Sequence, residues 1–181
     1  MQLKIIIRKT HKWLGLIIGL QILFWTFGGL VMSSFPLEQV HGDHLHKEIA
    51  PEGFDIQALY PIVDLVKASD FETREILTRG GFSGPQYRLR DEENKLHFYN
   101  AITGLTLEPI SNTQAITIAK SLYTGNADVR SSELITKNST EYRNRLPAWR
   151  IEFADNEAAT FYIAVDSGEL LSIRNSQWRI Y

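Results

Sequence analysis

Histidines gather at one place in this sequence. His41, His44 and His46 lie within six residues, with Asp43 among them and Glu48 just beyond. A short loop can fold such spacings around one ion, and imidazole together with carboxylate suits zinc, copper, nickel or iron. Two other interpretations fit the same residues: a solvated linker in which histidine is merely polar, and a pH sensor, because clustered imidazoles titrate near neutrality. These three histidines are our candidate metal ligands.

The other two histidines stand alone. His11 lies beside Lys12, at the edge of a long apolar segment. It is either one more polar residue at a membrane surface or a ligand to haem, which would need a second imidazole from another helix or a second chain. His97 lies between Leu96 and Phe98 in an alternating run, so we expect it to face solvent, opposite the apolar side chains.

No arrangement for catalysis is visible. The chain has no cysteine, which excludes disulfides, thiolate catalysis and cysteine-ligated zinc. It has no Gly-x-Ser-x-Gly and no His-Glu-x-x-His sequence, and its carboxylates are scattered over expected turns. The formal net charge of −2 argues against a nucleic-acid partner, which usually requires a broad basic surface. We therefore expect a protein that is not an enzyme.

An apolar stretch near the N-terminus decides the compartment. Residues 13–32 carry no charge, and at about 1.5 Å per residue they span about 30 Å, the thickness of the hydrocarbon core of a bilayer. The run is longer than that of a signal peptide, and no Ala-x-Ala cleavage site follows it. We predict a transmembrane helix at 13–35, after a basic cytoplasmic segment at 1–12 and before a histidine-rich linker at 36–55. The basic flank places the N-terminus in the cytoplasm. We therefore predict a protein of the bacterial cytoplasmic (inner) membrane, with the bulk of the chain outside the cytoplasm, in the periplasm.

The remainder of the chain contains an internal repeat. The stretch 98–107 matches 161–170 with one inserted residue, and an alternating run led by an aromatic residue precedes each copy, at 87–90 and at 149–152. A period of about 60 residues suits a duplicated small domain. We predict one unit at 56–109 and a second at 110–176, each a helix followed by about three antiparallel strands. The predicted fold class is thus α+β.

Helical spacing precedes the strands in both copies. In the second copy Ser111 and Gln114 form a capping box, and Gly125 is expected to end the helix. In the first copy Asp55 is a possible cap, with Pro61 near the start. The apolar positions at helical spacing are, in the first copy, Leu59, Ile62, Val63 and Val66, and in the second, Ala115, Ile118, Ala119 and Leu122.

Several of these segments resemble a known family. The basic opening at 8–16, the apolar span and the segment 38–45 resemble the membrane-helix region of PepSY-associated proteins. The run 149–153, followed by 164–171, is similar to a PepSY repeat, which ends in the pattern aromatic-x-x-Asp-x-x-Gly-Glu. In the first copy the positions of Asp166 and Glu169 correspond to Ile102 or Thr103 and to Leu105 or Thr106.

The resemblance implies a role and a second alternative. PepSY domains are non-catalytic modules proposed to inhibit or modulate peptidases, so it implies a membrane-anchored binding or regulatory protein with a protein partner. Related membrane proteins resemble haem-dependent ferric-siderophore reductases of iron uptake, which would make His11 a haem ligand in one subunit of such a system. These relatives carry a further membrane helix, and the aromatic and basic tail at 177–181 is expected to lead into one. Exposed sheet edges would let either kind of protein add a strand from a partner.

Overall fold

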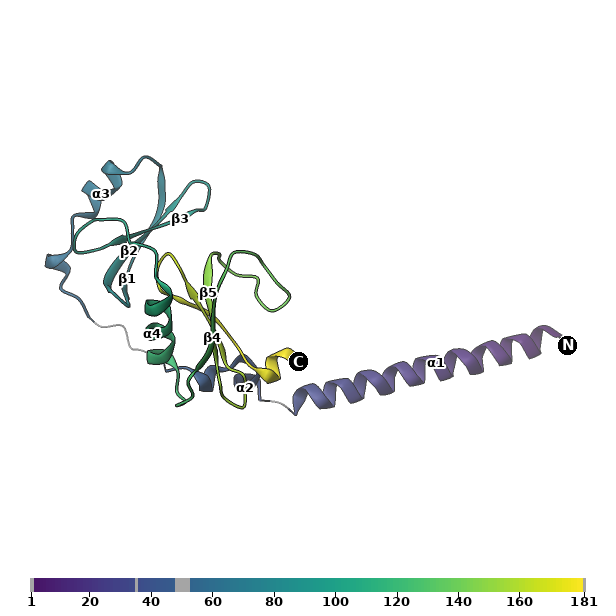
Figure 1. Cartoon of the computed structure of the whole chain (residues 1–181). Coiled ribbons are helices and arrows are strands. Elements are labelled where there is room, and N and C mark those ends of the chain that lie inside the picture. The colour runs from purple at the N-terminus through teal and green to yellow at the C-terminus, as the bar shows by residue number, and fades with distance from the viewer. Residues whose placement is uncertain (1, 35, 48–52, 181) are drawn as a thin grey trace.

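The computed structural model describes residues 2–34, 36–47 and 53–180. It has an α+β architecture, with a long N-terminal helix followed by two small antiparallel sheets, each covered on one face by a helix (Figure 1). The second sheet lies between the first sheet and the long helix in Figure 1. The predicted α+β class, the long apolar N-terminal helix and the two small antiparallel sheets are therefore confirmed.

The N-terminal helix α1 extends over Gln2–Ser33. Within it, Lys4–Ser33 is long and apolar enough to cross a membrane, and its side chains pack against no other part of the chain that the structure describes. The hydroxyl of Thr26 donates to the carbonyl of Ile22 at 2.9 Å, so this polar group is satisfied inside the helix, as a lipid surrounding requires. From residue 2 onward, the basic segment predicted at 1–12 is part of the same helix.

The histidine-rich segment after α1 is folded against the second unit. Val40 and Leu45 are 2% and 5% exposed, and Leu45 joins the core of that unit. The buried side-chain amide of Asn175 donates to the carbonyl of Gln39 at 2.7 Å. The expectation of a solvated linker is therefore wrong for 36–47, because apolar side chains dock the segment; residues 48–52 lie outside the described part. Its elements are α2 (Leu37–His41) and the 3-10 helix η1 (Asp43–Leu45).

The first unit has a three-stranded sheet in the order β1-β2-β3. Its core joins Leu65 to Tyr87 and Leu89, whereas Val63 is 59% exposed, so Leu65 replaces Val63 in the predicted apolar stripe. The helix begins after Pro61, and Asp55 caps a preceding 3-10 turn instead. The elements are η2 (Ile56–Ala58), α3 (Ile62–Ala68), β1 (Thr73–Gly81), β2 (Gly84–Asp91) and β3 (Leu96–Asn100).

The second unit has a four-stranded sheet in the order β4-β5-β6-β7. The predicted capping box of Ser111 and Gln114 is present, and the helix ends at Leu122, before Gly125. Ile118 and its neighbours on this helix pack on the sheet, in a core that includes Ile151. The elements are α4 (Asn112–Leu122), β4 (Val129–Ile135), β5 (Ala148–Phe153), β6 (Thr160–Ala164), β7 (Leu170–Arg174) and α5 (Ser176–Ile180).

The two units share one turn geometry. Gly104 and Gly168 both have φ of +71°, and the N–H of each donates to the carbonyl four residues earlier. On the preceding strands Phe98 pairs with Arg88, and Tyr162 pairs with Arg150. Phe98 is therefore equivalent to Tyr162 rather than to Phe161, and the repeat needs no inserted residue.

Candidate functional site

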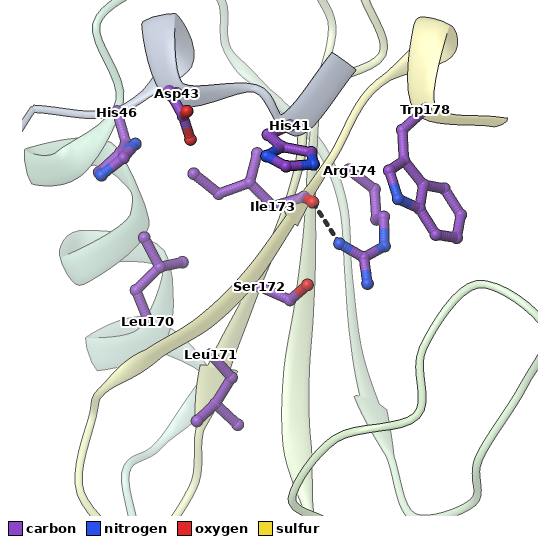
Figure 2. A pocket seen from close by; sticks show the side chains of 9 residues that line it. All are labelled: His41, Asp43, His46, Leu170, Leu171, Ser172, Ile173, Arg174 and Trp178. Atoms are coloured by element: carbon purple, nitrogen blue, oxygen red, sulfur yellow. Dashed lines mark hydrogen bonds between the residues drawn. The ribbon is translucent and has the colours of Figure 1, made fainter. Parts of the chain in front are cut away.

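The structure separates the three clustered histidines. His44 turns toward the β5–β6 hairpin, where its Nε2 lies 3.0 Å from Oε2 of Glu157. His41 and His46, with Asp43, line a hollow on the other side of the segment (Figure 2). Among the residues that the structure describes, no group of three His, Asp or Glu side chains is placed to hold a metal ion. The predicted set of His41, His44 and His46 is thus not brought together, because packing against the second unit fixes the segment in a different shape.

The hollow beside His41 and His46 has a volume of about 360 Å³. Its floor is β7, the edge strand of the second sheet opposite β4, and α2, η1 and α5 form its walls (Figure 2). Three polar side chains from β7 and α5 face it together with the two imidazoles: Ser172, Arg174 and Trp178. We call it the α2–β7–α5 pocket.

Arg174 is the fixed cation of this pocket. Its guanidinium carbon lies 4.1 Å from the centroid of the Trp178 ring. Its Nε donates to the carbonyl of Glu141 at 3.0 Å, and Nη1 donates to the carbonyl of Ile173 at 2.7 Å. Partial burial lowers the pKa of Arg174, although Tyr162 and Glu141 oppose that shift. Within the described residues no carboxylate lies within 4.0 Å of this guanidinium. The positive charge instead contacts two carbonyl oxygens and the face of an aromatic ring.

The residues that resemble the PepSY pattern lie at the junction of the two units. Arg145 of the β4–β5 loop contacts the carboxylates of Asp166 and Glu169 at 3.2 and 3.1 Å and the hydroxyl of Ser167 at 2.9 Å. Its guanidinium carbon lies 5.0 Å from the ring centroid of Phe98, on β3 of the first unit.

Two further contacts cross the junction. Arg79 of β1 donates to Glu169 at 2.5 Å, and the amide of Gln86 on β2 donates to the carbonyl of Ser167 at 3.3 Å. Burial raises the pKa of Asp166, and this effect outweighs the attraction of Arg145. The carboxylates of the pattern therefore join the two units and do not form an acid–base pair around an open cavity.

His97 is not on the solvent side of its sheet. It pairs across the strands with Leu89, which is fully buried, so both side chains lie on the face that α3 covers. Its ring stacks on Phe71 at 3.9 Å, and its Nε2 lies 2.9 Å from Oδ2 of Asp91. This hydrogen bond is the main reason that the pKa of Asp91 is lowered. The prediction failed because Phe98, taken as an inward residue, faces Arg145 of the second unit.

The outer strands of the two sheets differ in character. Ile76 and Leu77 on β1 are 46% and 36% exposed, although the partner of Ile76 across the strands, Leu89, is fully buried. The equivalent positions on β4 carry Ser132 and Glu133, as the shared register shows. The serine accepts a hydrogen bond from Asn112 of α4. The helix of the second unit thus reaches its outer strand, and the seven-residue α3 leaves Ile76 half-exposed.

His11 lies on α1, two residues before the uncharged stretch, and its side chain is exposed. Its helix packs against no other described part of the chain. A haem at this position therefore stays a prediction. Sequence reasoning missed Arg145, because its partners Asp166, Glu169 and Phe98 are distant along the chain. It also missed Arg174, although Trp178, on which Arg174 stacks, is only four residues later.

Comparison with family models, curated proteins and solved structures found no match for this chain.

Proposed function

We propose that this protein is a membrane-anchored, non-enzymatic binding module that holds an extended segment of a partner protein outside the cytoplasm. The PepSY resemblance implies a regulatory role, so the partner would be a protein that this module regulates, such as a peptidase. Three features support the proposal: the apolar helix α1, its basic N-terminal flank, and the use of the pattern carboxylates in a structural junction. They favour tethering and binding over chemistry.

The observation that carries the proposal is the outer strand β1. Among the residues that the structure describes, this nine-residue strand pairs on one side only, and it presents Ile76 and Leu77 on opposite faces, both accessible. An unpaired strand edge offers a row of N–H and C=O groups to an added strand. Apolar side chains on both faces would then contact alternate residues of that strand. The polar pair at the same positions of β4 shows that the fold does not require apolar residues there.

A residue exchange between the two units tests this assignment. The variant Ile76→Ser with Leu77→Glu gives β1 the residues that β4 already carries, so folding should be retained. An array of extended peptides is screened on the detergent-purified full chain, and affinities are measured by fluorescence polarisation. We expect the double variant to weaken binding at least tenfold. The control Leu134→Ser alters a similarly exposed residue, 45% accessible, on the outer strand of the second unit and should leave affinity unchanged.

Two results would contradict the binding proposal. One is that no extended peptide binds above the background of a scrambled set. The other is that the peptides that bind are indifferent to the β1 exchange. The anchoring is tested separately, by alkaline extraction of membranes and by reporter fusions after Leu37. An intact chain released into the aqueous phase, or a reporter active in the cytoplasm, would refute the topology.

A further inference from the structure

The α2–β7–α5 pocket lies close to the end of the apolar helix. His41 on its wall follows Ser33, the last residue of α1, by eight positions, and five of these form the compact helix α2. In Figure 1, α2 and the C-terminal helix lie next to this end of α1, and the first unit lies on the far side of the second. Because the headgroup layer extends about 5–8 Å beyond the hydrocarbon core, a pocket at this place is within reach of it.

The side chains of the pocket suit a phosphate. Nε and Nη1 of Arg174 donate to carbonyl oxygens, and among the described residues no group accepts from Nη2, which leaves this nitrogen for a phosphate oxygen. Stacking on Trp178 holds the guanidinium in one orientation. His41 lies near it, and Ser172 adds a hydroxyl on the floor (Figure 2). The one carboxylate that lines the pocket, Asp43, is beside His46, away from Arg174 in Figure 2. An anion would therefore occupy the Arg174 end.

The surroundings favour a lipid over a free ion. Both helices that flank the pocket carry an exposed apolar side chain: Leu37 on α2 is 54% exposed, and Ile180 on α5 is 87% exposed. Short helices with aromatic, basic and apolar residues are typical of the membrane interface. A soluble anion would need none of these apolar groups, whereas a lipid brings acyl chains beside its phosphate.

We propose that the α2–β7–α5 pocket binds the phosphate of an anionic lipid headgroup, with Arg174 as its main ligand and Trp178 and His41 beside it. The proposal rests on the membrane anchoring proposed above. It assigns the second unit a fixed position against the bilayer, with the pocket facing the headgroups.

The test uses the full chain in a non-ionic detergent. Binding of short-chain phosphatidylglycerol, short-chain phosphatidylcholine and inorganic phosphate is measured by isothermal calorimetry, and retained lipid is counted by native mass spectrometry. We expect phosphatidylglycerol to bind more tightly than phosphatidylcholine, and Arg174→Gln to weaken that binding about fivefold or more. Arg143→Gln removes an exposed cation at another place and should have no effect. His41→Ala should weaken binding without removing the stacked pair, in case the Arg174 variant loses its fold.

Each other result would overturn the proposal. Equal binding of the two lipids would show that the headgroup charge is not recognised. Inorganic phosphate binding as tightly as phosphatidylglycerol would make the site one for a soluble anion. Lipid binding that survives both Arg174→Gln and His41→Ala would place the lipid elsewhere. None of these results bears on peptide binding by β1 or on extraction from membranes, so a failure here is distinguishable from a failure of the proposed function.

Discussion

Replacing Arg145 with alanine should weaken the junction between the two units. The change removes the partner of Asp166 and Glu169 and the contact with Phe98. Removal of one partner from a fully buried ion pair costs about 3–5 kcal/mol, and from an exposed pair about 0.2–1 kcal/mol. The three charged side chains are between 20% and 35% exposed, so solvent screens part of the loss. With the cation–π contact included, we expect the free energy of unfolding to fall by about 2–4 kcal/mol.

Urea unfolding of the full chain in detergent provides the measurement. Circular dichroism reports both sheets. Tryptophan fluorescence reports the second unit through Trp149 and Trp178, because the other two tryptophans, Trp13 and Trp25, lie on α1 and the first unit has none. If the junction couples the units, the wild-type chain unfolds in one transition, and the variant unfolds in two. Arg143→Ala changes an exposed arginine of the same loop and should stay within about 0.5 kcal/mol of wild type. A loss below about 0.5 kcal/mol in Arg145→Ala, with a single transition retained, would refute the reasoning.

Three further predictions concern the fold and its pH dependence. Gly104→Ala should cost about 2–4 kcal/mol of unfolding free energy, because φ is +71° and the new Cβ would lie 2.7 Å from the Tyr60 ring; thermal unfolding measures it. Leu45→Ala should cost about 2–4 kcal/mol and expose the segment 36–47 to limited proteolysis, because Leu45 is 5% exposed in the core of the second unit. The pKa of Asp91 is lowered in the fold, so ionised Asp91 stabilises the fold above the ordinary carboxyl range, and this stabilisation is lost on acidification. The pKa of Asp166 is raised in the fold, so its ionisation destabilises the fold as the pH rises. The loss of stability between pH 7 and pH 3 should therefore be smaller in Asp91→Asn and larger in Asp166→Asn than in wild type, as urea titrations at both pH values will show.

Each of these has a matched comparison. Gly84→Ala has a φ of +100° and no atom within 4 Å of the new Cβ, so it should cost less than Gly104→Ala. Leu37→Ala changes an exposed leucine of the same segment, so the segment should resist proteolysis as well as it does in the wild type. Equal costs for the two glycines, unchanged proteolysis in Leu45→Ala, or the same acid loss in both aspartate variants would contradict the corresponding prediction.

The elements that sequence predicted well are those with a local cause. The run at 13–32 is uncharged and apolar on every face, so the long apolar helix can be recognised from this run alone, without any tertiary contact. The capping box of Ser111 and Gln114 closes over three residues of the same turn. Each of these two patterns is complete within one element. The repeat was read from the similarity of 98–107 and 161–170, but its alignment was one residue out of register, because the strand pairing makes Phe98 equivalent to Tyr162.

The parts that sequence did not predict depend on distant residues. On β3 both faces carry aromatic or apolar side chains, so alternation alone did not say which face α3 covers, and His97 was assigned to the wrong one. The orientation of β3 depends on Arg145 of the other unit, which covers Phe98. In the same way the histidine segment docks through Leu45 on a core built from residues more than sixty positions later, and Arg174 approaches His41 only through this docking.

The divergence of the two copies bears on where a partner would bind. The turn that carries Asp166 and Glu169 in the second unit contacts the first unit, and its equivalent in the first unit carries Ile102 and Leu105, which are 46% and 68% exposed. The second unit is also tied to the segment that leads from α1, and the first unit has no such tie among the described contacts. The first unit keeps the apolar residues of this turn and of its outer strand accessible, whereas the second unit uses the equivalent positions for internal contacts. The exposed apolar side chains therefore add no stability to the first unit. This asymmetry supports assigning partner binding to the first unit and anchoring to the second.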